Sequence, residues 1–289
     1  MKSGWGFYVP PATKGIQMTN SFFFSTEAVG TLPVPFQLIH NDCTAAMRTM
    51  QPNTVDLVFA DPPYFLSNGG TSCSGGKRVK VDKGDWDKPL APEEMHNFNM
   101  QWISECYRLL KATGSIFVSA SFHNLFDVGQ CLNEAGFITR NVITWQKTNP
   151  PPNLGCRCFK HSAEFIIWAV KNKSKHFFNY DLMKQMNGGT QMTDVWTGSL
   201  TPKSEKLWGH HPTQKPLYLL DRIIQAASKS GDLVLDPFCG SGTTGVAAVR
   251  HGRKFIGMEL SDEYIELSRK RINNELGLPN EQIITSVGS

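Results

Sequence analysis

A glycine-rich loop late in the chain sets the architecture. It reads Asp236-Pro237-Phe238-Cys239-Gly240-Ser241-Gly242-Thr243-Thr244 and lies between the apolar run 233–235 and a helical stretch that ends near Arg250. Such a loop normally opens a doubly wound sheet, but here only one clear strand, 254–260, and one helix follow it. Because these elements cannot form a sheet alone, N-terminal strands must complete it, as in a circular permutation.

The remaining periodicity supports this fold class. Strands are predicted at 36–40, 55–60, 115–118, 137–145 and 163–170, and helices at 93–110, 124–135 and 216–230. The alternation predicts an α/β fold with a doubly wound, mostly parallel sheet, in one domain spanning 36–289. We expect residues 1–35 to form an irregular arm, Leu66–Lys88 a long loop and 171–209 an inserted segment.

The glycine loop favours an anionic ligand. Glycines let a ligand approach the backbone, and the start of the following helix attracts negative charge. A phosphate-binding P-loop would need Lys after the second glycine, whereas Thr243 and Thr244 follow Gly242 here. Glu259, at the end of the next predicted strand, is suited to accept hydrogen bonds from the two hydroxyls of a ribose.

The motif Asp61-Pro62-Pro63-Tyr64 follows a buried strand and points to chemistry on an amino group. The lone pair of an amino group on an aromatic ring is delocalised, which makes it a poor nucleophile. Donation of its two N–H hydrogens to the Asp61 carboxylate and the Pro62 carbonyl would localise that lone pair for attack on a sulfonium methyl. The prolines fix the carbonyl direction, and the Tyr64 ring offers a stacking face for a flipped base.

The two motifs together resemble those of the DNA amino-methyltransferases. Their order, with the catalytic motif first, a basic insertion next and the cofactor loop last, is similar to the β class. Within that class, the segments 64–70, 81–88 and 145–150 resemble the second adenine methyltransferase of Dpn-type restriction–modification systems, which methylates GATC and accepts single-stranded DNA. The resemblance implies a seven-stranded, Rossmann-like sheet, S-adenosylmethionine as cofactor and transfer to adenine N6.

The resemblance also assigns cofactor residues. It places Asp42 on the cofactor's adenine amino group, although the sequence alone favours an Asx turn there. It places Thr213 and Lys215 along the methionine end, where Lys215 would pair with the carboxylate and Asp236 with the ammonium. The loop residues implied in cofactor binding are Phe238, Gly240, Gly242, Thr243 and Thr244. A homodimer and a cognate restriction endonuclease are implied as partners.

A basic segment suggests contact with DNA. Between Arg140 and Lys215 there are 11 Lys and Arg against 4 acids, an excess of 7, so the remainder carries 4 − 7 = −3 of the net charge of +4. Positive charge that flanks a catalytic loop favours phosphate binding. The candidate DNA contacts are Lys77, Arg78, Lys80, Lys147, Arg157, Lys160 and Lys184, and 171–209 is the expected target-recognition segment.

Other features narrow the class of protein. The 7 cysteines are scattered and odd in number, which favours reduced thiols. Cys156 and Cys158 form the one close pair, and nearby His161 gives at most a third zinc ligand, so no metal is predicted. No signal peptide or membrane span is recognised, and a soluble cytoplasmic protein is expected.

Competing interpretations stay open. An N4-cytosine methyltransferase would use the same chemistry, but such enzymes more often begin the motif with Ser. RNA or a protein side chain could be the substrate, or the fold could persist as an inactive binding module, against which the intact Asp61, Tyr64, Gly240 and Gly242 argue. A dinucleotide oxidoreductase is disfavoured because the glycine loop comes late and a second nucleotide-binding half is lacking.

Overall fold

The main sheet of the computed structural model combines strands from both ends of the chain. The structure describes residues 35–66, 71–74, 77–80, 87–150, 152–153 and 155–279, so the predicted arm lies almost wholly outside it. In spatial order the strands are β1 (Phe36–His40), β10 (Lys254–Glu259), β9 (Leu233–Asp236), β2 (Val55–Ala60), β5 (Leu110–Ala120), β7 (Ala163–Val170), β6 (Ile138–Lys147) and β8 (Val195–Gly198). Only the pairs that β7 makes with β5 and β6 are antiparallel.

The late strands β9 and β10 lie between the N-terminal strands β1 and β2, as the position of the glycine loop predicts. The sheet is mostly parallel, as expected, but the expected seven strands are too few, because it has eight. The additional strand β8 comes from the segment 171–209 and pairs with β6, so that β8 forms one edge of the sheet. With four residues, β8 is too short to show a period in the sequence.

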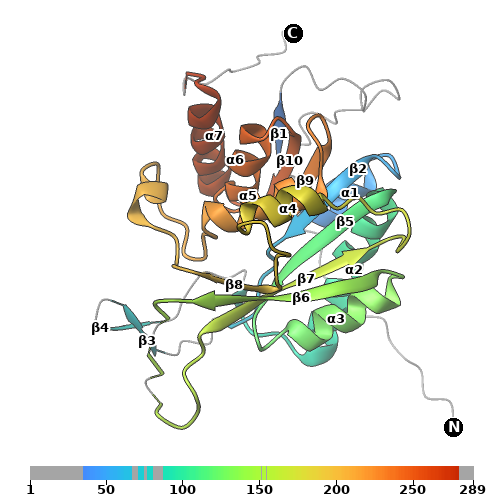
Figure 1. Cartoon of the computed structure of the whole chain (residues 1–289). Coiled ribbons are helices and arrows are strands. Elements are labelled where there is room, and N and C mark those ends of the chain that lie inside the picture. The colour runs from blue at the N-terminus through green and yellow to red at the C-terminus, as the bar shows by residue number, and fades with distance from the viewer. Residues whose placement is uncertain are drawn as a thin grey trace, which may run out of the picture.

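Helices cover both faces of the sheet (Figure 1). On one face α1 (Cys43–Arg48), α2 (Pro92–Leu109) and α3 (Leu125–Glu134) pack over a core that includes Met47, Trp102 and Leu132. On the other, α5 (Leu217–Ala227), α6 (Thr243–Arg250) and α7 (Asp262–Leu276) enclose a second core. Strands that are buried on both faces explain the continuous apolar runs of β2 and β9.

The segment 171–209 contains α4 (Tyr180–Met186), β8 and the 3₁₀ turn η2 (Lys203–Lys206). It is attached to the domain rather than separate from it. Asn179 N donates to Ala226 O of α5, and the Arg222 guanidinium of the same helix lies 4.7 Å from the ring centroid of the buried Trp196. The role of this segment in target recognition stays a prediction.

The prediction of a loop throughout 66–88 is wrong. Strands β3 (Thr71–Ser74) and β4 (Lys77–Lys80) form a two-stranded antiparallel sheet, which projects at the lower left of Figure 1. Backbone pairing between short polar strands leaves no apolar period to recognise. The sequence did hold one cue, because residues 75 and 76 between the strands are both glycine, a composition typical of short hairpin connections.

None of the helices within the described part of the chain is long and apolar enough to cross a membrane.

Candidate active site

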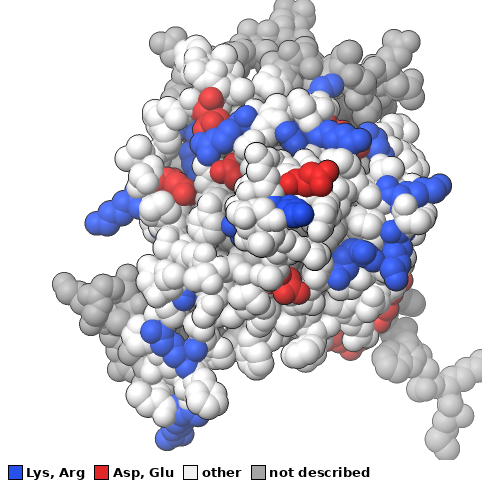
Figure 2. All heavy atoms as spheres, viewed as in Figure 1, with Lys and Arg blue, Asp and Glu red and all other residues white. Residues whose placement is uncertain are grey.

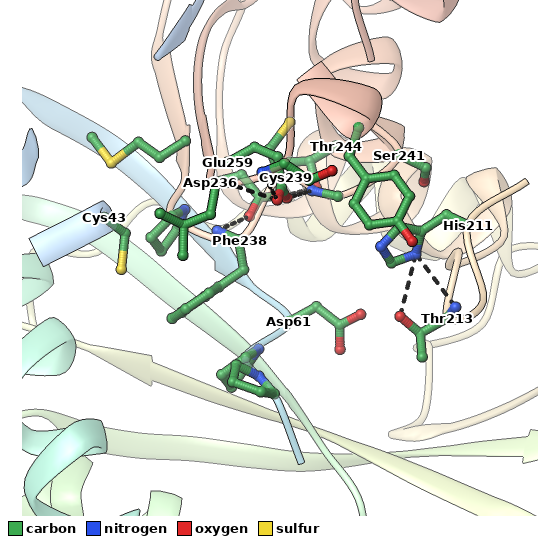
Figure 3. Close-up of a pocket in the computed structure, with 18 of the residues that line it drawn as sticks. Cys43, Asp61, His211, Thr213, Asp236, Phe238, Cys239, Ser241, Thr244 and Glu259 are labelled. Carbon is green, nitrogen blue, oxygen red and sulfur yellow. Dashed lines mark hydrogen bonds between the residues drawn. The ribbon is translucent and has the colours of Figure 1, made fainter. Parts of the chain in front are cut away.

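A cavity of about 430 Å³ opens at the carboxyl ends of the adjacent parallel strands β1, β10, β9 and β2. This is the edge at which ligands bind in open α/β sheets. The lining includes the four residues of the catalytic motif, Asp61, Pro62, Pro63 and Tyr64. It also includes most of the predicted cofactor residues, namely Asp42, Thr213, Lys215, Asp236, Phe238, Gly240, Thr243, Thr244 and Glu259. Figure 3 shows Asp61 pointing into this space, opposite the glycine loop.

Gly242 does not line the cavity but makes the loop possible. Its φ is +74°, and a Cβ at this position would lie 2.8 Å from the Cβ of Ser268 on α7. The turn is closed by a hydrogen bond from Gly242 N to Cys239 O (2.8 Å), and α6 begins at the next residue. Gly242 therefore allows the close packing of α6 against α7 that positions the loop.

Glu259, the last residue of β10, holds the glycine loop from the side. Its Oε2 accepts a hydrogen bond from Gly240 N (2.9 Å), and its Oε1 accepts from Leu260 N and Ser261 N (2.9 Å each). Each carboxylate oxygen can accept two hydrogen bonds, so Oε2 retains capacity for a hydroxyl in the cavity. Asp42 caps the start of α1 by accepting from Ala45 N (2.9 Å), the turn that the sequence alone favours.

Asp236 is a buried acid at the floor of the cavity. Its side chain accepts hydrogen bonds from Phe238 N (2.9 Å) and Thr244 Oγ1 (2.5 Å), and the residue is only 2% exposed. Burial, together with the nearby Asp61 and Glu259, raises the pKa of Asp236 to about 7 despite these hydrogen bonds. A cation placed beside this carboxylate would therefore be strongly favoured.

An aromatic wall closes one side of the cavity. The Phe238 ring packs edge-on against Trp102, with centroids 5.3 Å apart, and contacts Phe98 at 6.2 Å. On another side, His211 packs against Tyr264 at 4.3 Å and accepts a hydrogen bond from Thr213 N through Nδ1 (3.3 Å). The cavity thus combines apolar walls with a few fixed polar groups, as small-molecule sites usually do.

Asp61 is held by a network of side chains. Lys215 Nζ donates to both carboxylate oxygens of Asp61 (2.7 Å each), and the Tyr64 hydroxyl donates to Asp61 Oδ1 (2.9 Å). The same hydroxyl lies 2.8 Å from Ser119 Oγ. Burial and the adjacent Asp61 raise the pKa of Tyr64 well above its usual value, so the phenol remains a donor.

Lys215 lines the cavity and is held by acidic side chains, and its pairing with the methionine carboxylate stays a prediction. The side chain is 9% exposed, and its ammonium lies between Asp61 and Glu164, whose Oε2 is 3.6 Å away. Burial disfavours the charged form, but Asp61, Tyr64 and Glu164 outweigh it and raise the pKa of Lys215 well above its usual value. The sequence could not show this because Lys215 and Asp61 are separated by 154 residues.

Lys147 extends the network. It donates to Glu164, and its side chain is 13% exposed, while its predicted contact with DNA stays a prediction. Lys147, Glu164, Lys215 and Asp61 thus form an alternating row of two cations and two anions. Such a row compensates charges that would be costly to bury singly.

Three further residues of the site were missed in the sequence. The Ser119 hydroxyl lies next to the Tyr64 hydroxyl, and Glu164 contacts Lys147 and Lys215. The buried Asp87 accepts a hydrogen bond from Tyr64 N (3.0 Å). For Glu164 a signal existed, since it is an acid near the start of the otherwise apolar strand 163–170. An acid in such a strand is informative because buried charges are normally paired.

Among the remaining DNA candidates, Arg157, Lys160 and Lys184 are exposed and do not line the cavity. Lys77, Arg78 and Lys80 are on β4, where the structure describes the backbone alone. Figure 2 shows more basic than acidic side chains on the face viewed. The contacts of these residues with DNA stay predictions.

One group of possible metal ligands occurs among the described residues, formed by His96, Asp127 and Cys131. It joins α2 to α3, away from the cavity lining. The His96 ring is hydrogen-bonded through Nδ1 to Asp127 (2.8 Å) and through Nε2 to Glu134 (3.1 Å), and burial, reinforced by Asp127, raises the pKa of Cys131 to about 12. These contacts give the group a structural role in helix packing.

Comparison with known proteins identifies the family. The family model described as DNA methylase, which covers N6- and N4-specific enzymes, matches residues 55–270. The chain belongs to this DNA methylase family. It is 53% identical over 263 residues to the type II methyltransferase M2.DpnII of Streptococcus pneumoniae, which covers 90% of this chain and 95% of the relative. M2.LlaDCHI of Lactococcus lactis subsp. cremoris is 54% identical over 261 residues, covering 90% and 94%.

Solved methyltransferase structures share the fold. The M1.HpyAVI–SAM complex is 28% identical, with a TM-score of 0.61, over 82% of this chain and 99% of that one. The cytosine-N4-specific PvuII DNA methyltransferase matches with a TM-score of 0.66 over 82% and 86%, at 20% identity, and supports the fold alone. S-adenosylmethionine is the cofactor of this DNA methylase, as the sequence predicts.

Proposed function

We propose that this DNA methylase transfers a methyl group to the N6 amino group of adenine in GATC, on a base flipped into the cavity. One observation carries the proposal: the Asp61 carboxylate shares a single cavity with the glycine loop and Glu259. The acceptor of the amino hydrogens and the elements expected to hold the cofactor therefore border the same space. Direct transfer between two bound molecules requires that arrangement.

The catalytic loop would act on the target amino group through acceptors alone. One amino hydrogen is donated to Asp61 and the other to the Pro62 carbonyl, so the nitrogen lone pair faces away from both. Lys215 and the Tyr64 hydroxyl hold the Asp61 carboxylate in place before the base arrives. S-adenosylmethionine supplies an electrophilic methyl group on a sulfonium. Formation of the bond from N6 to the methyl group would break the sulfur–methyl bond and leave S-adenosylhomocysteine. The methylated nitrogen would then release one of its two protons along its hydrogen bond to Asp61 and on to solvent, without a covalent enzyme intermediate.

Tyr64 would form the stacking face for the flipped base. Its hydroxyl is bound to Asp61 and Ser119, its main-chain N–H donates to Asp87, and Lys215 Nζ lies 5.4 Å from the ring centroid. A ring held at both ends loses little further freedom when a base stacks on it. Preorganisation of this kind favours binding of the target in one orientation.

The cofactor would lie along the glycine loop. We assign its adenine amino group to Asp42, its ribose to the remaining acceptor capacity of Glu259, and its methionine ammonium to Asp236. Support for the last assignment comes from the raised pKa of Asp236, because an ammonium would stabilise its ionised form. Thr213 borders the methionine end, where it lies beside His211.

Three assignments rest on resemblance to the M2-type relatives: adenine as the target base, GATC as the recognition site and a role in restriction–modification. The leading Asp61 favours adenine over cytosine N4, although the family includes both kinds of enzyme. By the same resemblance we assign the chain a homodimeric state, activity on single-stranded DNA and a cognate restriction endonuclease. The 53% identity over nearly the whole chain supports these assignments.

The test is transfer of labelled methyl groups to matched oligonucleotides. Single- and double-stranded substrates carry one GATC, the same bases in scrambled order, or a GATC whose adenine already has an N6-methyl group. We expect label on the unmodified GATC substrates only, recovered as N6-methyl-2′-deoxyadenosine after digestion. Recovery of N4-methylcytosine, or equal label on scrambled DNA, would overturn the adenine or the GATC assignment respectively.

A further inference from the structure

Three exposed rings cluster beyond the carboxyl end of β5. The rings of Phe122 and His161 stack with centroids 5.6 Å apart and an interplanar angle of 26°. His123 lies 5.2 Å from Phe122 and 6.4 Å from His161. Phe122 is 54% exposed, and both histidines are exposed as well. We call these three residues the ring cluster.

The ring cluster lies close to the catalytic network. Phe122 follows Ser119 by three residues, and Ser119 contacts the Tyr64 hydroxyl. His161 precedes Glu164 by three residues, and Glu164 contacts Lys215. Three residues span at most about 10 Å, so the Cα atoms of Phe122 and His161 lie within that distance of the Cα atoms of Ser119 and Glu164, respectively.

Positive charge accompanies these rings. The loop between β6 and β7 carries the exposed Arg157 and Lys160, together with Phe159, which is 97% exposed. Figure 2 shows basic side chains on the projection at the lower left, where Figure 1 places this loop. Exposed aromatic faces beside cations are the combination that binds single nucleic-acid strands, through base stacking and phosphate contacts.

We propose that the ring cluster stacks on an unstacked DNA base that neighbours the target adenine, while Arg157 and Lys160 bind the adjoining phosphates. The inference rests on the proposed function, because a flipped target leaves its neighbours without a stacking partner. Single strands expose such faces throughout, whereas a duplex exposes them only where the target leaves the stack. The cluster therefore contributes more to binding of single-stranded than of double-stranded DNA.

The experiment measures fluorescence anisotropy of a labelled oligonucleotide that contains one GATC, single-stranded or as a duplex, in the presence of S-adenosylhomocysteine. Phe122→Ala and His161→Ala are expected to weaken single-strand binding by roughly 5- to 100-fold each, the range for loss of one base–aromatic stack. The affinity of both variants for the duplex is expected to fall by a smaller factor. Phe122→Trp, which keeps a stacking face, retains the wild-type affinity.

Phe126 supplies the matched control, because it is 78% exposed on α3, four residues beyond Phe122. Phe126→Ala is expected to bind DNA as the wild type does, and cofactor binding by calorimetry confirms that each variant is folded. Unchanged single-strand affinity in both ring variants overturns the proposal. A changed molecular mass by light scattering, with DNA affinity unchanged, also overturns it and assigns the surface to a second copy of the chain. Anisotropy measures DNA binding and does not depend on which base is methylated. Failure of the adenine assignment would therefore show in the labelled-methyl experiment and would not alter the result of this one.

Discussion

The two sides of the cavity are built differently. On the cofactor side, the glycine loop is continuous in the sequence and the acids are fixed mainly by backbone groups, as in the three N–H donors that hold Glu259. On the catalytic side, Asp61 is fixed by side chains from distant segments, above all Lys215 and Tyr64. We therefore expect substitutions on the cofactor side to lower mainly the stability of the fold and the affinity for the cofactor. Substitutions on the catalytic side should lower mainly the turnover rate.

The largest effect is expected from Asp61→Ala. It removes the acceptor of the target amino group, and loss of one preorganised hydrogen-bonding group typically lowers turnover by about 100- to 1000-fold. Single-turnover rates measure the change, with calorimetric cofactor affinity as the control for folding. If Asp61→Ala lowered the cofactor affinity by as large a factor as the turnover rate, the distinction between the cofactor side and the catalytic side would not hold.

Gly242→Ala probes the cofactor side through stability. The left-handed φ of +74° costs a non-glycine residue about 1–2 kcal/mol, and the approach of 2.8 Å to Ser268 adds about 1–3 kcal/mol of overpacking. Gly188→Ala is the control, because its φ is +65° and no atom lies within 4 Å of the added Cβ. Urea unfolding should show the larger loss for Gly242, and equal losses would contradict the packing account.

Cofactor affinity should depend on pH through Asp236. Its pKa of about 7 without a cation means that the folded chain binds a proton there that the unfolded chain has released, so this group lowers stability as pH rises from about 4 to 7. The methionine ammonium needs the ionised form, so affinity for S-adenosylmethionine is expected to weaken by up to about tenfold per pH unit below 7 and to level off above it. Calorimetry over this range gives the profile, which Asp236→Asn should flatten at a lower affinity. If the affinity of the wild-type protein for S-adenosylmethionine did not change with pH, Asp236 would not be the residue that binds the methionine ammonium.

The smallest effect is expected from Glu164→Gln, which keeps the shape of the side chain but removes the second carboxylate beside Lys215. Interaction energies of such ion pairs, about 0.2–1 kcal/mol, correspond to a loss of turnover of up to roughly 5-fold, with cofactor affinity unchanged. Glu134→Gln is the control, since Glu134 pairs with His96 away from the cavity. Steady-state kinetics distinguish the two variants, and a loss of cofactor affinity in Glu164→Gln would place Glu164 on the cofactor side.

The same contrast explains what the sequence could reveal. Asp61 and the glycine loop were recognisable because each motif is contiguous and follows an apolar strand, and parallel strands then bring their ends to one edge. The Lys215–Asp61 pair was not recognisable, because it joins residues 154 positions apart. Strand β8 and the β3–β4 hairpin were missed for another reason: short strands held by backbone pairing carry no apolar period.

In the proposed mechanism the Asp61 carboxylate directly accepts a hydrogen bond from the target amino group. A crystal structure of the chain with a GATC oligonucleotide and a non-transferring analogue of S-adenosylmethionine would show whether this contact exists. We predict the adenine N6 within hydrogen-bond distance of an Asp61 oxygen and of the Pro62 carbonyl, with the base against Tyr64. A flipped adenine seated away from Asp61, or a cytosine in its place, would contradict the account.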